Sequence, residues 1–323
     1  MNILVTGANG QLGQEIKWAV DIIGNGKPDH FVGEKNYYIF TGHDELDITD
    51  EQAVLNFVKD NHISVIVNCA AYTNVEKAQT DRELAYDINA KGPMNLALAA
   101  SAVGSVLIHI STDYVFGGKR NTPLPPVSIG EDLLYFPDID RDDCFYGYSK
   151  NIGEHLIQQT GCKYLIFRTS WLYSTHGKNF VRTMFERAWS GQNSKVVYDE
   201  VGSPTNSEDL AQFIVYIIDN NTAETRYLSK TGVYNFSNNG VASWYDLAQR
   251  VYHRVPYAEV TPCRHSEFKS SVNRPSYSVF DLSKTEAAFN YKTRYWGVAV
   301  DSVVGKLINE FCDKKENNEK ENK

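Results

Sequence analysis

Short, largely apolar runs alternate with helical patterns along the first half of the chain. Runs of this kind are typical of parallel strands that are buried on both faces of a sheet. The pattern predicts strands at residues 3–6, 37–41, 65–70, 106–111 and 164–168, and helices at 12–20, 50–60, 83–103 and from residue 146. This strand–helix alternation predicts an α/β fold with a doubly wound parallel sheet, as in a Rossmann domain.

The order of elements becomes mixed after Trp171. Helices are predicted at 179–189, 207–219 and 244–252, and strands at 195–198 and 232–236. We interpret the second half as a smaller α/β C-terminal substrate lobe that is interleaved with late Rossmann elements. The predicted division gives residues 1–170 and parts of about 206–236 to the dinucleotide-binding domain, and residues 171–205 and 237–311 to the lobe.

Three further segments depart from the regular pattern. Residues 21–36 lengthen the first crossover, and residues 117–144 form a Pro- and Asp-rich loop. That loop is expected near the carboxyl edge of the sheet. Residues 312–323 are charged and almost free of apolar side chains, so a disordered tail is expected there.

A glycine-rich turn, TGANGQLG, follows the first predicted strand and opens the first helix. Gly7, Gly10 and Gly13 would let the backbone turn tightly and approach a pyrophosphate. That anion would then lie on the unpaired N–H groups of the helix N-terminus. An ordinary glycine turn is the alternative. The strand–turn–helix context favours dinucleotide binding, and the G-x-x-G-x-x-G spacing indicates a short-chain dehydrogenase.

A second pattern, Tyr146-Gly-Tyr-Ser-Lys150, lies at the start of the helix before the fifth predicted strand. Residues four apart share one face of a helix, and an ammonium there can lower the pKa of a phenol. In a chain with 20 tyrosines, such a pair also arises by chance. Thr112, at the end of the strand before it, could cap the strand or hydrogen-bond a substrate carbonyl. Together the three residues predict a catalytic set.

Composition and net charge limit the classes of binding partner that the protein can have. The net charge of −8 argues against nucleic acid or an anionic membrane as the main partner. Five widely spaced cysteines, without a CxxC pair, argue against a zinc site or a disulfide framework. No apolar run approaches the ~20 residues of a membrane helix, and no signal-peptide pattern opens the chain. We therefore expect a cytoplasmic protein.

These motifs together resemble the extended short-chain dehydrogenase/reductases, and within them the dTDP-4-dehydrorhamnose reductases. The resemblance runs from residue 3 to about 285. Its matching segments are TGANGQLGQE, LDITD, VNCAAYTNVEKAQTD, YDINAKGPMNLA, STDYVFGG, YGYSK, RTSWLYSTHGKNFVRTM, GSPTNSEDLA and NRPSYSVFDLSK. The glycine and Tyr-x-x-x-Lys motifs are common to the superfamily, whereas RTSWLY–GKNF, GSPT and RPxxS indicate the rhamnose branch.

The resemblance implies a set of binding residues. A nicotinamide dinucleotide would contact Gly7, Asn9, Gly10, Gln11, Leu12, Gly13, Asp47, Ile48, Ala70, Ala71, Tyr72, Thr73, Asn89, Tyr146 and Lys150. A nucleotide sugar would contact Thr112, Asp113, Tyr114, Trp171, Asn179 and Arg274. A guanidinium suits phosphate oxygens, so Arg274 would pair with the diphosphate. Core packing is the alternative role for Trp171, and a surface charge for Arg274.

The implied reaction is reduction of the C4 ketone of dTDP-4-dehydro-L-rhamnose to dTDP-L-rhamnose. The cofactor would be NADPH or NADH, and the choice is open because residues 40–43 offer neither the acid nor the arginine that selects the ribose. Another nucleotide-sugar reductase or an epimerase of this superfamily is the nearest alternative. A non-catalytic NADP-binding regulatory subunit is disfavoured by the intact Thr112–Tyr146–Lys150 set.

The resemblance also implies a quaternary arrangement. Glu15, Glu208 and Glu310 match positions at which some rhamnose-branch reductases bind Mg²⁺ across a homodimer interface. Carboxylate oxygens suit Mg²⁺, and three converging glutamates would repel one another without a cation. Three unrelated surface carboxylates are the alternative. The expected partners are thus a dTDP-sugar and a second copy of this chain.

Overall fold

The computed structural model describes residues 1–26, 36–117, 142–267, 272 and 274–321. Within this part of the chain, no helix has the length and apolar character needed to cross a bilayer. Most of the loop expected at 117–144, and residues 27–35 of the insertion at 21–36, lie outside the described residues. The beginning of that insertion extends helix α1, which runs from Gln11 to Gly26.

A six-stranded parallel sheet forms the centre of the first domain, as the alternating pattern predicts. Its strand order is β10-β5-β4-β3-β1-β2, so the order reverses between β1 and β3. The strands are β1 (Asn2–Thr6), β2 (Tyr37–Thr41), β3 (Ile63–Asn68), β4 (Val106–Thr112), β5 (Lys163–Thr169) and β10 (Gly232–Asn235). In sheets of this kind, ligands bind beyond the carboxyl ends of the strands near that reversal.

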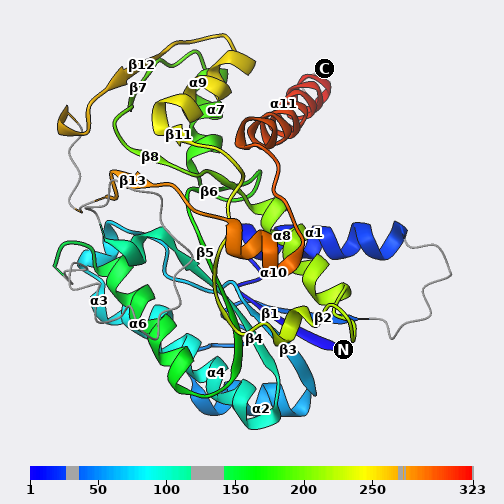
Figure 1. The fold of residues 1–323 in the computed structure, drawn as a ribbon. Coiled ribbons are helices and arrows are strands. Elements are labelled where there is room, and N and C mark those ends of the chain that lie inside the picture. The colour runs from blue at the N-terminus through cyan, green and yellow to red at the C-terminus, as the bar shows by residue number, and fades with distance from the viewer. Residues whose placement is uncertain (27–35, 118–141, 268–271, 273, 322–323) are drawn as a thin grey trace.

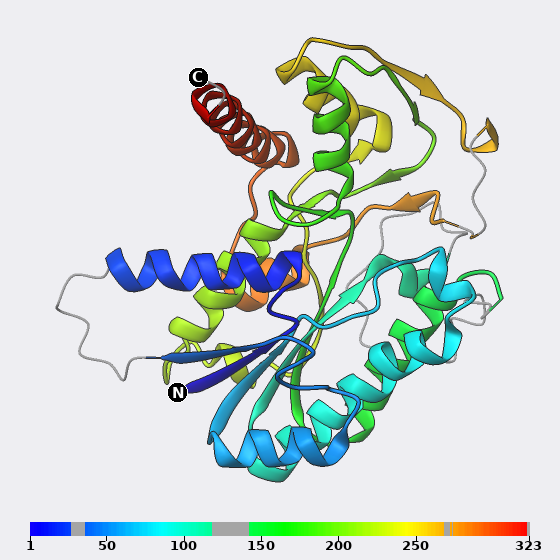
Figure 2. The same ribbon diagram turned by 180° about the vertical axis from the view of Figure 1, so that it is seen from behind.

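Helices cover both faces of this sheet (Figures 1 and 2). Alternate strand residues supply the two cores: Ile3 and Val5 pack toward α1 and α8, whereas Leu4 packs toward α2 and α4. The helices on one face are α2 (Glu51–Asp60), α4 (Gly92–Val103) and α6 (Phe145–Gln159), with α1, α8 (Ser207–Asp219) and α10 (Ser283–Phe289) on the other. Burial of the inner strands on both faces explains why they lack polar alternation.

The helix expected over residues 83–103 is divided into three segments. They are α3 (Arg82–Tyr86), a π-helical turn (Asp87–Lys91) and α4. π-Helical turns inside α-helices are frequent at functional sites. The turn holds Asn89, whose backbone carbonyl oxygen would be 2.1 Å from a Cβ placed on Gly153 of α6. The π turn and α6 therefore approach closely only because position 153 is glycine.

The second lobe packs its own core of aliphatic and aromatic side chains above the sheet's carboxyl edge (Figure 1). Its short strands pair in three small groups, β11–β8–β13, β12–β7 and β6–β9. The elements are β6 (Leu172–Tyr173), α7 (Phe180–Trp189), β7 (Ser194–Val197), β8 (Val201–Gly202), β9 (Thr205–Asn206), β11 (Ala242–Ser243), α9 (Trp244–Arg254), β12 (Val260–Cys263), β13 (Tyr277–Ser278) and α11 (Trp296–Glu321).

Two boundaries differ from the sequence prediction. Helix α10 was expected in the lobe, but its Phe289 is fully buried in the Rossmann core against Phe167 and Phe213. The disordered tail expected at 312–323 is also wrong for residues 312–321, because α11 continues to Glu321. That segment is rich in Lys and Glu, which have high helix propensity, so a helix already begun at Trp296 can continue without burial.

Candidate active site

The glycine turn joins β1 to α1 at the strand-order reversal. Gly7 has a φ of +68°, and a Cβ on it would lie 2.5 Å from the backbone nitrogen of Ala70. A Cβ on Gly13 would lie 2.5 Å from the carbonyl oxygen of Gly7. A Cβ on Gly10 would meet only the Gly7 carbonyl oxygen, in a tight contact of 3.2 Å, so this position is less crowded than the other two. Gly7 and Gly13 let the loop close tightly, and Gly10 leaves room beside the helix N-terminus.

This loop has the features of a pyrophosphate cradle. Helix α1 begins at Gln11, and the first N–H groups of a helix have no partner within it. Gln11 and Leu12 thus lie where those groups and the positive end of the helix dipole attract an anion. Asn9 lies beside Gly42, since a Cβ there would be 2.5 Å from the Asn9 amide nitrogen. The residues present therefore fit the dinucleotide that the sequence predicts.

The segments expected along the dinucleotide adjoin this loop. Residues 70–73 follow β3, and the backbone N–H of Tyr72 donates to the side-chain oxygen of Asn89 at 2.9 Å. The Asn89 amide donates to the Tyr72 carbonyl and to the Ser149 hydroxyl, both at 3.1 Å. Asn89 thereby ties the 70–73 segment, including Ala70, Ala71 and Thr73, to helix α6.

The segment after β2 packs on the start of α4. A side-chain oxygen of Asp47 accepts hydrogen bonds from the N–H and hydroxyl of Thr49, and the Ile48 carbonyl accepts from Asn95 at 3.0 Å. Glu45, which the sequence reasoning overlooked, accepts the Gly42 N–H at 2.7 Å. An acidic side chain near the end of β2 is the usual partner of a ribose hydroxyl, so Glu45 qualifies although it lies past the usual position.

The catalytic set gathers where β4 ends and α6 begins. The Tyr146 ring meets Tyr114 edge to face, with centroids 5.4 Å apart. Burial raises the pKa of the Tyr146 phenol well above its ordinary value, and a hydrogen bond with Thr112 partly opposes this. Thr112 also donates its hydroxyl proton to Asp113 at 3.0 Å. Burial raises the pKa of the Asp113 carboxyl to about 6.

Lys150 lies one turn further along α6 and is fully buried. Its amine donates to the Ile110 carbonyl at 2.7 Å and lies 3.2 Å from a ring nitrogen of His109. Burial lowers the pKa of the Lys150 amine to about 8. The prediction that Lys150 lowers the pKa of Tyr146 is wrong for this structure, because burial raises that pKa and the Lys150 amine is directed instead to the Ile110 carbonyl in β4.

A cavity of about 410 Å³ opens in the lobe between α7 and β7. Its wall is mainly apolar or aromatic but includes two arginines, and the lining residues are Phe180, Thr183, Met184, Arg187, Ser194, Lys195, Val196, Val197, Glu200, Trp244 and Arg274. Arg274 pairs with Glu76 at 3.0 Å, and its buried Nε has no hydrogen-bond partner among the described residues. Tyr114 is close enough to Arg274 for the two to interact electrostatically. Arg274 thus links the cavity to Tyr114, whose ring packs against Tyr146.

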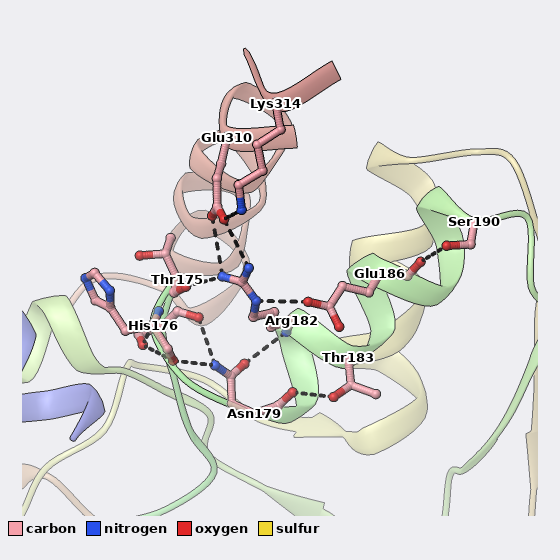
Figure 3. A network of polar contacts seen from close by, with 10 residues as sticks. Thr175, His176, Asn179, Arg182, Thr183, Glu186, Ser190, Glu310 and Lys314 are labelled. Atoms are coloured by element: carbon pink, nitrogen blue, oxygen red, sulfur yellow. Dashed lines mark hydrogen bonds and ion pairs between the residues drawn. The ribbon is translucent and has the colours of Figure 1, made fainter. Parts of the chain in front are cut away.

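Two residues expected at the substrate have structural roles. Asn179 is the N-cap of α7: its oxygen accepts the Arg182 N–H at 2.9 Å, and its amide donates to the Ser174 and His176 carbonyls (Figure 3). Trp171 stacks on Trp244, with ring centroids 3.7 Å apart and planes within 9°. Trp244, which the sequence reasoning missed, lines the cavity, so Trp171 supports that wall from behind.

The three glutamates expected to bind Mg²⁺ do not form a metal site in the described part of this chain. No group of three His, Cys, Asp or Glu residues suited to a metal occurs there. Glu208 pairs with Lys306 at 2.8 Å. Glu310 pairs with Arg182 at 3.1 Å and with Lys314 (Figure 3). Lysine and arginine side chains thus supply the cations that the prediction assigned to a metal.

Comparison with known proteins gives consistent matches over the whole length. The family model described as RmlD substrate binding domain matches residues 1–309. A dTDP-4-dehydrorhamnose reductase of Aggregatibacter actinomycetemcomitans is 33% identical over 313 residues, which cover 93% of this chain and 97% of the relative. A probable dTDP-4,6-dihydroxy-2-methyloxan-3-one 4-ketoreductase of Streptomyces antibioticus is 36% identical over 303 residues, covering 93% of each chain.

A solved structure matches equally broadly. The crystal structure of dTDP-4-dehydrorhamnose reductase from Bacillus anthracis in complex with NADP has a TM-score of 0.79 and 32% sequence identity. The match covers 94% of this chain and 99% of that chain. The agreement includes both the Rossmann sheet and the smaller lobe.

The glycine loop gives a first prediction. Gly10→Ala should fold normally but weaken NADH or NADPH binding by about tenfold or more, about 1.4 kcal/mol, because the added methyl occupies the cradle. Gly13→Ala should instead destabilise the fold by about 1–3 kcal/mol, because its methyl meets backbone atoms. Calorimetric titration and urea unfolding measure the two effects. Unchanged cofactor affinity in folded Gly10→Ala would show that the glycine loop does not bind the pyrophosphate.

Glu15 gives a prediction about pH. Burial, with a contribution from neighbouring Glu208, raises the pKa of its carboxyl to about 7. Between the ordinary value of 4.5 and about 7 the folded state binds more protons than the unfolded state, so stability falls as pH rises through this window. Glu15→Gln mimics the neutral acid. The free energy of unfolding of this variant, relative to that of the native protein, should therefore increase by about 1–3 kcal/mol from pH 5 to pH 8.

Urea unfolding at both pH values measures this gain. Glu186→Gln is the matched control, since that carboxylate is about half exposed and should give a similar effect at both pH values. If Glu15→Gln and the native protein differ in stability by the same amount at pH 5 and pH 8, then Glu15 is not neutral in the folded protein at low pH.

Proposed function

Because this chain belongs to the family described as RmlD substrate binding domain, we propose that it reduces the C4 ketone of dTDP-4-dehydro-L-rhamnose with NADPH or NADH, forming dTDP-L-rhamnose. One observation carries the proposal. The glycine cradle and the Thr112–Tyr146–Lys150 set lie at the carboxyl edge of the sheet, and Arg274 links this set, through Tyr114, to the cavity. A dinucleotide, a ketone and a nucleoside diphosphate need those three features in that order.

The cavity suits the dTDP part of such a substrate. Phe180, Met184 and Trp244 offer apolar and aromatic surface to a base. Arg274 offers its guanidinium, whose buried Nε has no partner among the described residues, to the diphosphate. Because Tyr114 connects Arg274 to Tyr146, a sugar attached to that diphosphate would extend toward the catalytic tyrosine.

Tyr146 is the proton donor in this proposal. When bound, the reduced nicotinamide supplies the hydride to C4. The Tyr146 hydroxyl gives its proton to the ketone oxygen, so the ketone gains one hydride and one proton and becomes an alcohol. The raised pKa keeps the phenol protonated at neutral pH, so the proton is in place when the substrate binds. Lys150 would hold the cofactor's ribose hydroxyls and stabilise the phenolate that forms.

Thr112 and Asp113 would orient the ketone beside Tyr146. The Thr112 hydroxyl accepts from the Tyr114 N–H at 3.3 Å, which fixes the hydroxyl at the end of β4. A hydrogen bond to a developing oxyanion from a fixed group stabilises the transition state. Since Thr112 donates to Asp113 in this structure, its proton would turn to the substrate oxygen on binding.

A different dTDP-linked ketone is the alternative substrate. The Streptomyces antibioticus relative is named as a probable 4-ketoreductase of another dTDP sugar. The same cavity would bind the shared dTDP group, so the sugar alone would distinguish the two substrates. A homodimer, implied by the resemblance, and a cytoplasmic location, expected from the sequence, stay predictions, and sedimentation of the purified protein tests the first.

A coupled assay tests the proposed reaction. Supplied with dTDP-4-dehydrorhamnose, the enzyme should oxidise one NADPH or NADH for each sugar reduced. An epimerase would return its cofactor unchanged, and a regulatory subunit would consume none. The ratio of kcat/KM for the two cofactors settles the preference. Isomerised sugar without net cofactor oxidation would contradict the proposal.

Substitution of the proton donor tests the mechanism. Tyr146→Phe should lower kcat by roughly 10²–10⁴-fold, because general acid catalysis contributes that much. Its affinity for the cofactor should stay nearly native, since only the hydroxyl is lost. Tyr148→Phe, two residues along the same helix, is the matched control and should keep native kcat. Native turnover in Tyr146→Phe would exclude this residue as the acid.

A further inference from the structure

A row of buried polar side chains crosses three strands beneath Lys150. Thr6, Asn68 and His109 are register partners on β1, β3 and β4, and each is at most 1% exposed. The Thr6 hydroxyl donates to the Asn68 oxygen at 2.8 Å, and the Asn68 amide nitrogen lies 3.0 Å from Nδ1 of His109. Nε2 of the same ring lies 3.2 Å from the Lys150 amine. The row therefore ends at a catalytic residue.

The backbone fixes the orientation of the Asn68 amide. The Ala70 N–H donates to the Asn68 side-chain oxygen at 3.1 Å. A backbone N–H can only donate, so the oxygen must face Ala70 and Thr6. Rotating the amide by 180° would place two donors against each other. The NH₂ group of Asn68 must therefore face His109.

This orientation fixes the tautomer of His109. Because Asn68 presents a donor, Nδ1 of His109 must accept and carries no proton. A neutral imidazole holds its one proton on the other nitrogen, so Nε2 is protonated and points at Lys150. Burial and the nearby Lys150 amine lower the pKa of His109 well below its ordinary value, which keeps the ring neutral.

A protonated Nε2 meets the Lys150 amine in a way that depends on the charge of Lys150. An ammonium has only donors, so it would oppose the N–H of His109, whereas a neutral amine has a lone pair that accepts it. We propose that His109, held as the Nε2–H tautomer by Asn68, is a positioning residue that stabilises the neutral amine of Lys150. The proton equilibrium of the catalytic lysine is then set from inside strand β4.

The other groups around Lys150 are consistent with this role. Glu154, one turn further on α6, favours the ammonium but is engaged by Arg168 at 2.7 Å. Cys69, at the end of β3, also faces the amine, and burial raises the pKa of its thiol to about 12, so it is neutral. His109 is thus the side chain from β4 whose tautomer favours the neutral form of Lys150.

This arrangement would matter for the reaction, and that part of the inference rests on the proposed function. After Tyr146 has donated its proton, the phenolate must regain one before the next turnover. A lysine whose pKa is near 8 exchanges a proton more readily at neutral pH than one at the ordinary value of 10.5. His109 would therefore set the alkaline limb of the pH–rate profile.

The tautomer can be measured without any assay. In protein labelled with ¹⁵N-histidine, two-bond ¹H–¹⁵N spectra distinguish the protonated from the bare ring nitrogen. The signal of His109, among eight histidines, is the one lost in His109→Gln. A neutral ring with its proton on Nε2 supports the proposal. A proton on Nδ1, or a charged ring at neutral pH, overturns it whatever the enzyme reduces.

The pKa of Lys150 gives the second readout. In protein labelled with ¹³C-lysine, Lys150→Arg identifies its signal. His109→Gln can turn an amide oxygen to the lysine, so the pKa of Lys150 should rise by about one unit or more, with an equal shift of the alkaline limb. Thr6→Val is the control: Ala70 still fixes the Asn68 amide, so neither tautomer nor pKa should change. An unaltered Lys150 pKa in folded His109→Gln would refute the proposal.

Discussion

The ion pair between Glu154 and Arg168 lies where the helix bearing Tyr146 and Lys150 meets the sheet. Both side chains are at most 1% exposed, and the Ser111 hydroxyl also donates to Glu154. Arg168 lies over the Phe116 ring, 4.6 Å from its centroid, so the pair links α6, β5 and the turn after β4. A buried charge left without its partner is costly, so α6 cannot slide along the sheet without losing several kcal/mol.

Parallel strand register carries this constraint to the rest of the site. Thr112 and Thr169 are paired at the ends of β4 and β5, while Thr6 and Asn68 are paired at the ends of β1 and β3. Polar side chains concentrate at these ends because a parallel sheet with both faces covered offers water and ligands only its edges. The cradle, the tyrosine and the strand-end hydroxyl are neighbours for that reason, although they are far apart in sequence.

The sequence was sufficient wherever chemistry depends on local spacing. Gly7, Gly10 and Gly13, the Tyr146–Lys150 pair and the parallel sheet all follow from short-range patterns. His109 was missed because one polar residue within an apolar run has no spacing signal, and its role depends on Asn68 from another strand. A magnesium site across a dimer interface stays a prediction, and within this chain Glu208 and Glu310 pair with Lys306 and Arg182, which come from distant parts of the sequence. Ion pairs between residues far apart in the sequence cannot be predicted from local patterns.

The chain passes repeatedly between the two parts of the molecule. It enters the lobe after β5, returns for α8 and β10, leaves again for β11 and α9, and returns for α10 before ending in α11. Each passage is a separate covalent connection between the Rossmann domain and the lobe. Several chain connections restrict relative movement of the two parts more than a single linker does. The lobe thus cannot be detached as an independent module.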